Sequence, residues 1–301
     1  FPTSLASQMK QLGYQTIYWY GGNASYGNFN HFGKAQGFDR VESASIFCGP
    51  DAPKTWVGVY DHIFLENIEQ QIKAIDTPTF HFIYTTSNHS PYKIEDSLLD
   101  YDPATVMPHV GEDLRSNKTR NKELATYRYS DKALFSFVDS MKKAYPDSLF
   151  IITGDHSNLF GDLNNTSLIH RDYTLRDTFC TVALLQHPDL DSNMITTQKG
   201  THMSLMPTII EAIAPKGFEY YSITPSLFDD QPETLVTPYQ WITDSLMGDV
   251  RSDYGESNQP SAEPVHPIRP IDNHAKEARD WSLLTTWLIN HEEKLFSKKD
   301  D

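Results

Sequence analysis

Residues that can bind a metal ion or a polar ligand follow two apolar stretches of this chain. Asp155 and His156 come directly after Gly154, which ends the apolar run 149–153. A carboxylate and an imidazole both suit Zn²⁺, Mn²⁺ or Fe²⁺. We therefore predict that Asp155 and His156 bind a divalent metal. The alternative, in which Gly154 and Asp155 form a plain turn and His156 is a surface residue, stays open from the local pattern alone.

The second stretch, residues 79–86, is followed by Ser87-Asn88-His89. Two strand ends that each present a histidine support a site better than either one alone. Asn88 and His89 are therefore candidates for contacting a ligand. His202 precedes the apolar helical pattern 203–213 and is a further candidate, although it can equally be a capping or surface residue.

The elements that must position these residues follow from hydrophobic periodicity. Apolar runs rich in Ile, Phe and Tyr predict strands at 15–20, 79–86, 149–153 and 179–185. Helical spacing predicts helices at 3–12, 61–75, 129–145, 203–213 and 277–296. We expect 149–153 to be a buried, central, parallel strand, because ligands of open α/β sheets bind beyond the carboxyl ends of such strands.

Several finer expectations belong to these elements. The inner face of helix 129–145 should contain Leu134, Phe135, Val138 and Met141. Gly21-Gly22 should form either a plain turn or a close approach of the backbone to a ligand. Residues 24–60 and 93–121 read largely as loops, 219–246 as small strands, and 252–275 as a long irregular connection.

Composition excludes some classes of function. The chain has 301 residues, of which 39% are hydrophobic, and a net charge of -15, so a nucleic-acid-binding role is disfavoured.

We expect one domain over 1–301, with 215–301 as its C-terminal part. There is no transmembrane run and no initiator Met, and we expect the chain to be a piece of a longer protein.

In order along the chain, four segments resemble the lipoteichoic acid synthase and phosphoglycerol transferase branch of the alkaline phosphatase/sulfatase superfamily. Each segment is weak alone, but their order and spacing over residues 3–215 are specific. The segments are Leu12–Thr16 with Tyr20–Asn23, Thr79–Tyr92, Tyr129–Leu134 leading to Gly154-Asp155-His156, and His202–Ile209.

The resemblance implies an alkaline phosphatase-like α/β sandwich around a central, mostly parallel sheet flanked by helices. It implies that Asp155 and His156 are ligands of a divalent metal, Mn²⁺ in the first place, with Zn²⁺, Mg²⁺ or Ca²⁺ as alternatives. It implies that His89 contacts the substrate phosphate; we also expect Asn88 and His202 to bind substrate. It further implies an extracytoplasmic domain in the bacterial cell envelope, tethered through upstream membrane helices.

The chain departs from the family pattern at several positions. The family's nucleophilic Thr or Ser and first acidic metal ligand align upstream of Phe1, and neither Thr3 nor Ser4 is assigned as nucleophile. A Trp and an Arg that hold the lipid head group align with Gly27 and Phe29. Ser204 stands where an Asp is usual. These departures put phosphoglycerol specificity in doubt.

Cys48 invites comparison with the sulfatase Cys-x-Pro-x-Arg motif, whose cysteine becomes the nucleophile. The Arg position is Ala52, and the motif lies after the first strand and turn, where the family's nucleophile should precede them. We therefore interpret Cys48 as an ordinary thiol, and the sequence does not show whether it pairs with Cys180.

The expected activity is metal-dependent transfer or hydrolysis of a phosphate or sulfate ester, most simply phosphoglycerol transfer on an envelope lipid or glycan. Two alternatives are a sulfatase or phosphodiesterase of soluble esters and a catalytically incomplete module that binds envelope glycans. Residues 1–301 alone are expected to hydrolyse no ester above background. Robust turnover of an aryl phosphate or sulfate would contradict this expectation.

Overall fold

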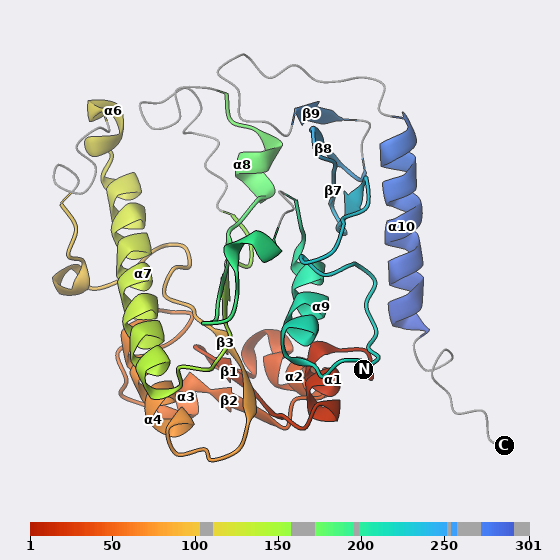
Figure 1. Cartoon of the computed structure of the whole chain (residues 1–301). Coiled ribbons are helices and arrows are strands. Elements are labelled where there is room, and N and C mark those ends of the chain that lie inside the picture. The colour runs from red at the N-terminus through yellow and green to blue at the C-terminus, as the bar shows by residue number, and fades with distance from the viewer. Residues whose placement is uncertain (103–110, 158–171, 196–198, 252–253, 258–271, 292–301) are drawn as a thin grey trace. The chain divides into compact units, whose positions relative to one another are not determined.

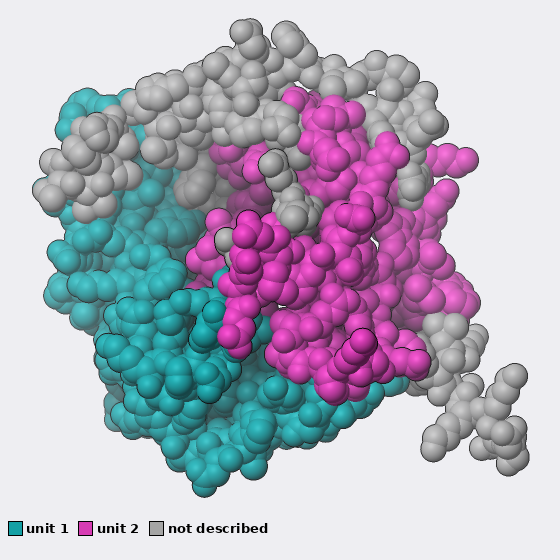
Figure 2. Space-filling model, in the orientation of Figure 1, with its two compact units in different colours: residues 1–150, 185–188 teal, residues 151–184, 189–301 magenta. Residues whose placement is uncertain are grey.

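The computed structural model describes the chain except for residues 103–110, 158–171, 196–198, 252–253, 258–271 and 292–301 (Figure 1). The chain divides into two compact units (Figure 2). Unit 1 comprises residues 1–150 and 185–188, and unit 2 comprises residues 151–184 and 189–301. Among the described residues, no helix is long and apolar enough to span a lipid bilayer.

Unit 1 is a mixed α/β structure around a parallel sheet. Its strands are β1 (Gln15–Tyr20), β2 (Arg40–Ser43) and β3 (Thr79–Tyr84), in the order β2-β1-β3. Its helices are α1 (Leu5–Gln11), α2 (Phe29–Ala35), α3 (Ala44–Phe47), α4 (Asp61–Ile72), α6 (Glu112–Arg115) and α7 (Lys118–Ala144), with 3-10 turns η1 (Tyr26–Asn28) and η2 (Asp96–Leu98).

The strand β1 is buried along almost its whole length. Ile17 and Trp19 are 0% exposed, and Tyr18 and Tyr20, which point to the opposite face, are 2% and 3% exposed. A strand buried on both faces needs continuous apolar side chains, as β1 has. It pairs in parallel with β2 and β3, so the carboxyl ends of all three strands lie at one edge of the sheet. The predicted mostly parallel sheet is confirmed for this unit.

The helix α7 is longer than predicted, because it begins at Lys118 rather than near Tyr129 and includes residues that read as a charged surface loop. It packs along α4 (Figure 1). Val138 and Met141 face the core as expected, but Phe135 is 38% exposed and Phe137 is buried in its place. The prediction for Phe135 was therefore wrong, because the 3.6-residue period places Phe137, not Phe135, with Val138 and Met141.

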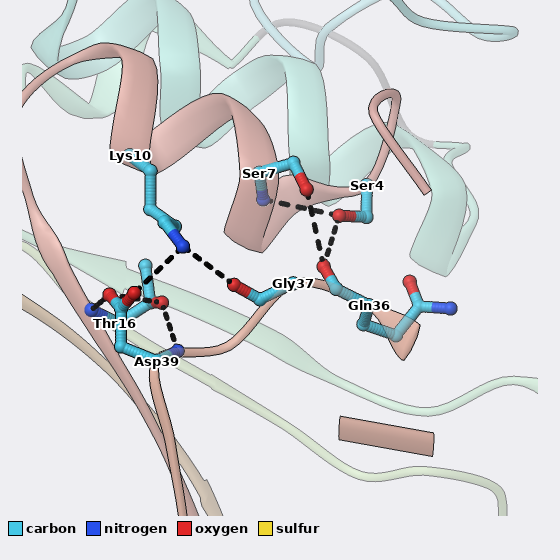
Figure 3. Close-up of polar contacts among 7 residues, drawn as sticks. All are labelled: Ser4, Ser7, Lys10, Thr16, Gln36, Gly37 and Asp39. Atoms are coloured by element: carbon cyan, nitrogen blue, oxygen red, sulfur yellow. Dashed lines mark hydrogen bonds and ion pairs between the residues drawn. The ribbon is translucent and has the colours of Figure 1, made fainter. Parts of the chain in front are cut away.

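The helix α1 is fixed to the segment that leads into β2 (Figure 3). Ser4 is the N-cap residue: its Oγ accepts from Ser7 N at 3.1 Å and donates to the carbonyl of Gln36. At the other end, Lys10 Nζ lies 2.7 Å from Asp39, whose carboxylate also accepts from the backbone N–H and hydroxyl of Thr16. The Ser4 hydroxyl thus serves the fold.

The strands β4 (Phe150–Thr153) and β5 (Ala183–Gln186) pair in a two-stranded sheet, and unit 2 contains residues 151–153 of β4 and 183–184 of β5. Its helices are α8 (Leu175–Phe179), α9 (His202–Ile213) and α10 (Asp272–Asn290), with the 3-10 turn η4 (Ser192–Met194). The β4 side chains are only partly buried, and Thr153 is exposed. Among the described residues β4 pairs with β5 alone, so the prediction of a buried, central strand at 149–153 was wrong.

The C-terminal part of unit 2 is a four-stranded antiparallel sheet of β6 (Leu235–Val236), β7 (Gln240–Ile242), β8 (Leu246–Asp249) and β9 (Gly255–Ser257). The helix α10 packs on it through Ala278 and Trp281, which join a core around Trp241. Small strands were expected up to residue 246, but β8 and β9 extend beyond that point.

The loops were predicted less well than the buried elements. The strand β2 and the helix α3 lie within 24–60, which read as a loop. The predicted strand 179–185 begins only at Ala183, because its first residues end α8. Most of the Asn- and Gly-rich loop after His156, much of 252–275 and the end of the predicted terminal helix lie outside the described residues.

Candidate active site

In unit 1, the turn after β3 is held by one buried carboxylate. Asp61, the first residue of α4, is 1% exposed, and its Oδ1 accepts from the backbone N–H groups of Thr86 at 3.1 Å and Ser87 at 3.0 Å. In return, Asp61 N donates to Ser87 Oγ at 2.8 Å. Burial raises the pKa of the Asp61 carboxyl, while the hydrogen bonds from Thr86 and Ser87 act in the opposite direction. The backbone that precedes Asn88 and His89 is thereby fixed.

The helix α7 completes this anchor through two adjacent residues. Ser130 Oγ donates to Asp61 Oδ2 at 3.2 Å, so both carboxylate oxygens have partners. The Tyr129 hydroxyl lies 2.6 Å from His62 Nδ1, and burial raises the pKa of Tyr129. Tyr129 and Ser130 begin one of the four segments on which the resemblance depends, and they bind α7 to the start of α4.

Gly21-Gly22 is explained by a close approach of backbone to backbone. A Cβ on Gly22 would lie 2.5 Å from the carbonyl oxygen of Val57, and one on Gly58 would lie 2.3 Å from that of Gly21. Val59 N donates to Gly21 O at 2.9 Å. The glycines let the segment 57–59 pack directly on the end of β1, which is a structural use rather than a ligand cradle.

His89 is exposed and has a defined orientation. Its Nδ1 lies 2.7 Å from the carbonyl oxygen of Ser90. A carbonyl only accepts, so Nδ1 carries the proton and Nε2 is left for a ligand. Beside it, Asn88 Oδ1 is a buried acceptor with no hydrogen-bond donor among the described residues. An unsatisfied buried acceptor is costly unless a ligand or water pairs with it.

In unit 2, Asp155 and His156 follow β4 as adjacent donors. His156 Nδ1 lies 2.8 Å from the carbonyl of Ser157, so Nδ1 donates and Nε2 keeps its lone pair. Nε2 lies 3.7 Å from Asp155 Oδ2, and the two side chains are 79% and 54% exposed. Gly154 is required here, since a Cβ would lie 2.4 Å from Thr181 Oγ1.

The end of β4 is held by hydrogen bonds from side chains to backbone carbonyl oxygens. Ser157 Oγ donates to the carbonyls of Asp177 and Thr178 in α8. His202 Nε2, at the start of α9, lies 2.7 Å from the carbonyl of Gly154 and therefore donates to it. His202 thus contacts the residue before Asp155, and its Nδ1 is the nitrogen left for any further partner.

The donor set of Asp155 and His156 fits a divalent metal in type and placement. An ion bound at about 2.1 Å from each donor can bridge atoms up to about 4.2 Å apart, and Nε2 and Oδ2 lie 3.7 Å apart. The Nδ1–H bond to a carbonyl is the support that metal-binding histidines use. The described residues contain no group of three or more His, Cys, Asp or Glu side chains that could hold a metal, so these two are a partial set.

The structure also places other positions that the sequence analysis named. Phe29 packs against the core with its ring tilted on that of Tyr20, ring centroids 4.4 Å apart, while Gly27 provides a positive φ of 61°. Burial raises the pKa of the Cys48 thiol to about 11, as expected of an ordinary thiol, and Cys48 and Cys180 are both free. Ser204 is fully buried in α9, and its hydroxyl has no partner among the described residues.

A profile of the sulfatase family matches residues 1–214. The chain belongs to the sulfatase family. The lipoteichoic acid synthase-like YvgJ of Bacillus subtilis is 26% identical to this sulfatase-family chain over 157 residues, which are 51% of this chain and 24% of YvgJ. Lipoteichoic acid synthase 2 of the same organism is 21% identical over 155 residues, 51% of this chain and 22% of its own length. The alignments thus span about a quarter of these curated relatives.

Solved structures of this superfamily share the fold. The lipoteichoic acid synthase LtaP of Listeria monocytogenes superposes with a TM-score of 0.70 at 16% identity, covering 95% of this chain and 72% of LtaP. An alkaline phosphatase superfamily protein of Vibrio parahaemolyticus gives 0.67 at 20% identity, covering 96% of this chain and 68% of its own. The predicted alkaline phosphatase-like α/β fold is thereby confirmed, and the profile match confirms the sulfatase family.

Asp61 and Trp56 are site-related residues that the sequence did not single out. Asp61 read only as the start of a helix, and Trp56 as part of a loop. Each acts on residues about 25 to 34 positions later, and local periodicity carries no signal of such a contact. Asn88 and His89 lie together in unit 1, and Asp155, His156 and His202 lie together in unit 2.

Proposed function

We propose that this chain belongs to a metal-dependent transferase or hydrolase of phosphate or sulfate esters, acting on a cell-envelope lipid or glycan by phosphoglycerol transfer. The observation that carries the proposal is the orientation of His156: its Nδ1–H is bound by a carbonyl and its Nε2 lies 3.7 Å from Asp155 Oδ2. Family membership and the lipoteichoic acid synthase-like relatives support the reaction class.

Asp155 and His156 would hold the cation, with Mn²⁺ as the first candidate and Zn²⁺, Mg²⁺ or Ca²⁺ as alternatives. When bound, such an ion lowers the pKa of a hydroxyl nucleophile and stabilises negative charge on a nonbridging oxygen. We assign no residue of this chain as the nucleophile, which is expected to be a Thr or Ser.

His89 would act on the ester group of the substrate. Because its Nδ1–H is bound to Ser90 O, proton exchange takes place at Nε2. Protonated, Nε2 donates a hydrogen bond to an ester oxygen; neutral, it accepts a proton. Asn88 would pair its buried Oδ1 with a hydroxyl of the substrate, because that atom only accepts. His202 would contribute Nδ1, since its Nε2 is bound to Gly154.

The metal assignment is tested by adding Mn²⁺ to ¹⁵N-labelled chain 1–301 and recording paramagnetic line broadening. Broadening is expected first at residues 154–157 and is expected to disappear in the double variant Asp155→Asn/His156→Ala. His187→Ala, which removes a partly exposed histidine of unit 1 that is also bound to a backbone carbonyl, is the control. Equal broadening in the double variant would contradict the metal assignment.

A second candidate, a sulfatase or phosphodiesterase of soluble esters, is favoured by one observation. The positions that align with the head-group Trp and Arg are Gly27, which has no side chain, and Phe29, which packs against the core. Assays of the longest encoded form with phosphatidylglycerol, aryl phosphates and aryl sulfates separate the two candidates. Turnover of phosphatidylglycerol alone supports the envelope transferase. Turnover of only the aryl esters supports the second candidate.

A further inference from the structure

The carbonyl oxygen of Ser90 accepts two side-chain hydrogen bonds. Trp56 Nε1 donates to it at 3.0 Å, and His89 Nδ1 donates to it at 2.7 Å. Both distances are those of well-formed hydrogen bonds. One backbone atom therefore links the imidazole of His89 to an indole that comes from 34 positions earlier in the chain.

The two rings are also in direct contact. Their centroids lie 5.3 Å apart with an interplanar angle of 81°, which is an edge-to-face arrangement. Trp56 is nevertheless 59% exposed, an unusual position for so large an apolar side chain. The exposed ring still has defined contacts, namely the hydrogen bond to Ser90 O and the edge-to-face contact with His89.

The loop that presents Trp56 is itself fixed. Thr55 N donates to Gly58 O at 2.8 Å, Val59 N donates to Gly21 O at 2.9 Å, and Tyr60 N donates to Pro53 O at 3.0 Å. The loop is therefore tied to the end of β1. A ring carried by such a loop can hold another residue in place, because its own backbone has little freedom.

We propose that Trp56 is a positioning residue for His89: by sharing the Ser90 carbonyl and packing against the imidazole, it holds His89 with Nδ1 protonated and Nε2 directed away from the backbone. The consequence for catalysis rests on the proposed function, in which His89 Nε2 contacts the ester group. The positioning itself does not depend on that function. Loss of the indole removes one of the two donors to the Ser90 carbonyl and the ring that packs against the His89 imidazole.

The direct test is the tautomer of neutral His89, measured by long-range ¹H–¹⁵N correlation NMR on chain 1–301. The wild-type ring is expected to carry its proton on Nδ1. Trp56→Ala is expected to shift the population toward the Nε2–H form, and Trp56→Phe, which keeps a ring but no N–H donor, to give an intermediate ratio. Because Trp56 is mostly exposed, both variants are expected to fold.

Trp287→Ala is the matched control. Trp287 is 48% exposed and also contacts a histidine, His291, with ring centroids 4.5 Å apart. It belongs to unit 2 and has no role in the proposal. This variant is expected to leave the His89 tautomer unchanged. A wild-type tautomer ratio in Trp56→Ala would overturn the proposal.

A second measurement separates this proposal from the proposed function. Titration with glycerol 1-phosphate, followed through the His89 resonances, is expected to show about 3- to 10-fold weaker binding in Trp56→Ala, the effect of one well-oriented hydrogen bond. A tautomer shift without any response of wild-type His89 to glycerol 1-phosphate supports the positioning and counts against the proposed role of His89. Unchanged affinity together with an unchanged tautomer counts against the positioning.

Discussion

The strand end of unit 1 that carries His89 and the strand end of unit 2 that carries His156 orient their histidines alike, but different contacts hold the backbone at each. In both, a histidine donates Nδ1–H to the carbonyl of the next residue, Ser90 or Ser157. The turn before His89 is fixed by Asp61, a carboxylate that is 1% exposed. The turn around His156 is held by the side chains of Ser157 and His202, which donate to backbone carbonyls.

This difference predicts that substitutions at the strand end of unit 1 lower the stability of the fold, whereas substitutions at the strand end of unit 2 lower ligand binding. A buried carboxylate with several donors makes the first strand end part of the core of unit 1, so changes there should cost folding free energy. The side chains of Asp155 and His156 are mostly exposed, so changes there should cost binding and little stability. The predictions below test this contrast in order of decreasing effect on stability.

Asp61→Ala is expected to have the largest effect. It leaves the buried N–H groups of Thr86 and Ser87 without an acceptor, at a cost of about 3 kcal/mol in the free energy of unfolding. Asp61→Asn keeps one acceptor oxygen and should cost about half as much. Urea unfolding measures both. Asp76→Ala, at an exposed position, is the control and should change stability by less than about 0.5 kcal/mol. If Asp61→Ala is as stable as this control, the predicted difference in stability between the two strand ends is wrong.

His81, on β3 of unit 1, makes the stability of this unit sensitive to pH. Its Nδ1 accepts from Trp19 Nε1 at 3.1 Å, which requires the neutral ring, and burial and the nearby Arg40 lower its pKa from 6.5 to about 4. The unfolded chain therefore binds more protons than the folded chain between these values, and stability falls as the pH is lowered through this range. The expected loss between pH 6.5 and about pH 5 is about 1.5 kcal/mol.

His81→Gln checks the origin of this pH dependence. Glutamine offers an acceptor to Trp19 but does not titrate, so the slope of unfolding free energy against pH in this window should become smaller. Chemical denaturation at a series of pH values measures the slope. Wild-type and variant curves that run parallel would show that other groups cause the dependence.

His202→Ala tests the support of the second strand end. Loss of the bond to the Gly154 carbonyl should lower the affinity for Mn²⁺ about 10-fold, as removal of supporting contacts does at metal sites. Unfolding free energy should fall by only about 1 kcal/mol. His291→Ala, which removes an exposed histidine bound to the carbonyl of Trp287, is the matched control. Unchanged Mn²⁺ affinity would show that His202 does not support the metal site.

The sequence predicted those parts of the molecule that local patterns determine. The strands β1 and β3 were found because their apolar runs are continuous, and the order of four segments indicated the family. The strand β2 was missed because it lies at one side of the described sheet and its charged residues Arg40 and Glu42 form a half-buried ion pair at 2.7 Å. Polar edge residues read as loop in any single sequence.

The supports of the site could not be predicted in the same way. Asp61 reaches Thr86, and Trp56 reaches Ser90, through contacts that only the folded chain creates. Residue type alone does not separate Asp61 from Asp155, since both read as an aspartate at the boundary of an element. Burial separates them: Asp61 is 1% exposed, and the Asp155 side chain is 54% exposed.

Asp155→Ala should therefore have the smallest effect on stability and a large effect on binding. The side chain accepts from His156 N at 2.9 Å, an exposed contact whose loss should cost less than about 1 kcal/mol in unfolding free energy. The same change removes half of the donor pair and should abolish the Mn²⁺ broadening at residues 154–157. Urea unfolding and Mn²⁺ titration of one sample measure both effects. A loss of stability as large as that of Asp61→Ala would show that Asp155 serves the fold, and the contrast between the two strand ends would fail.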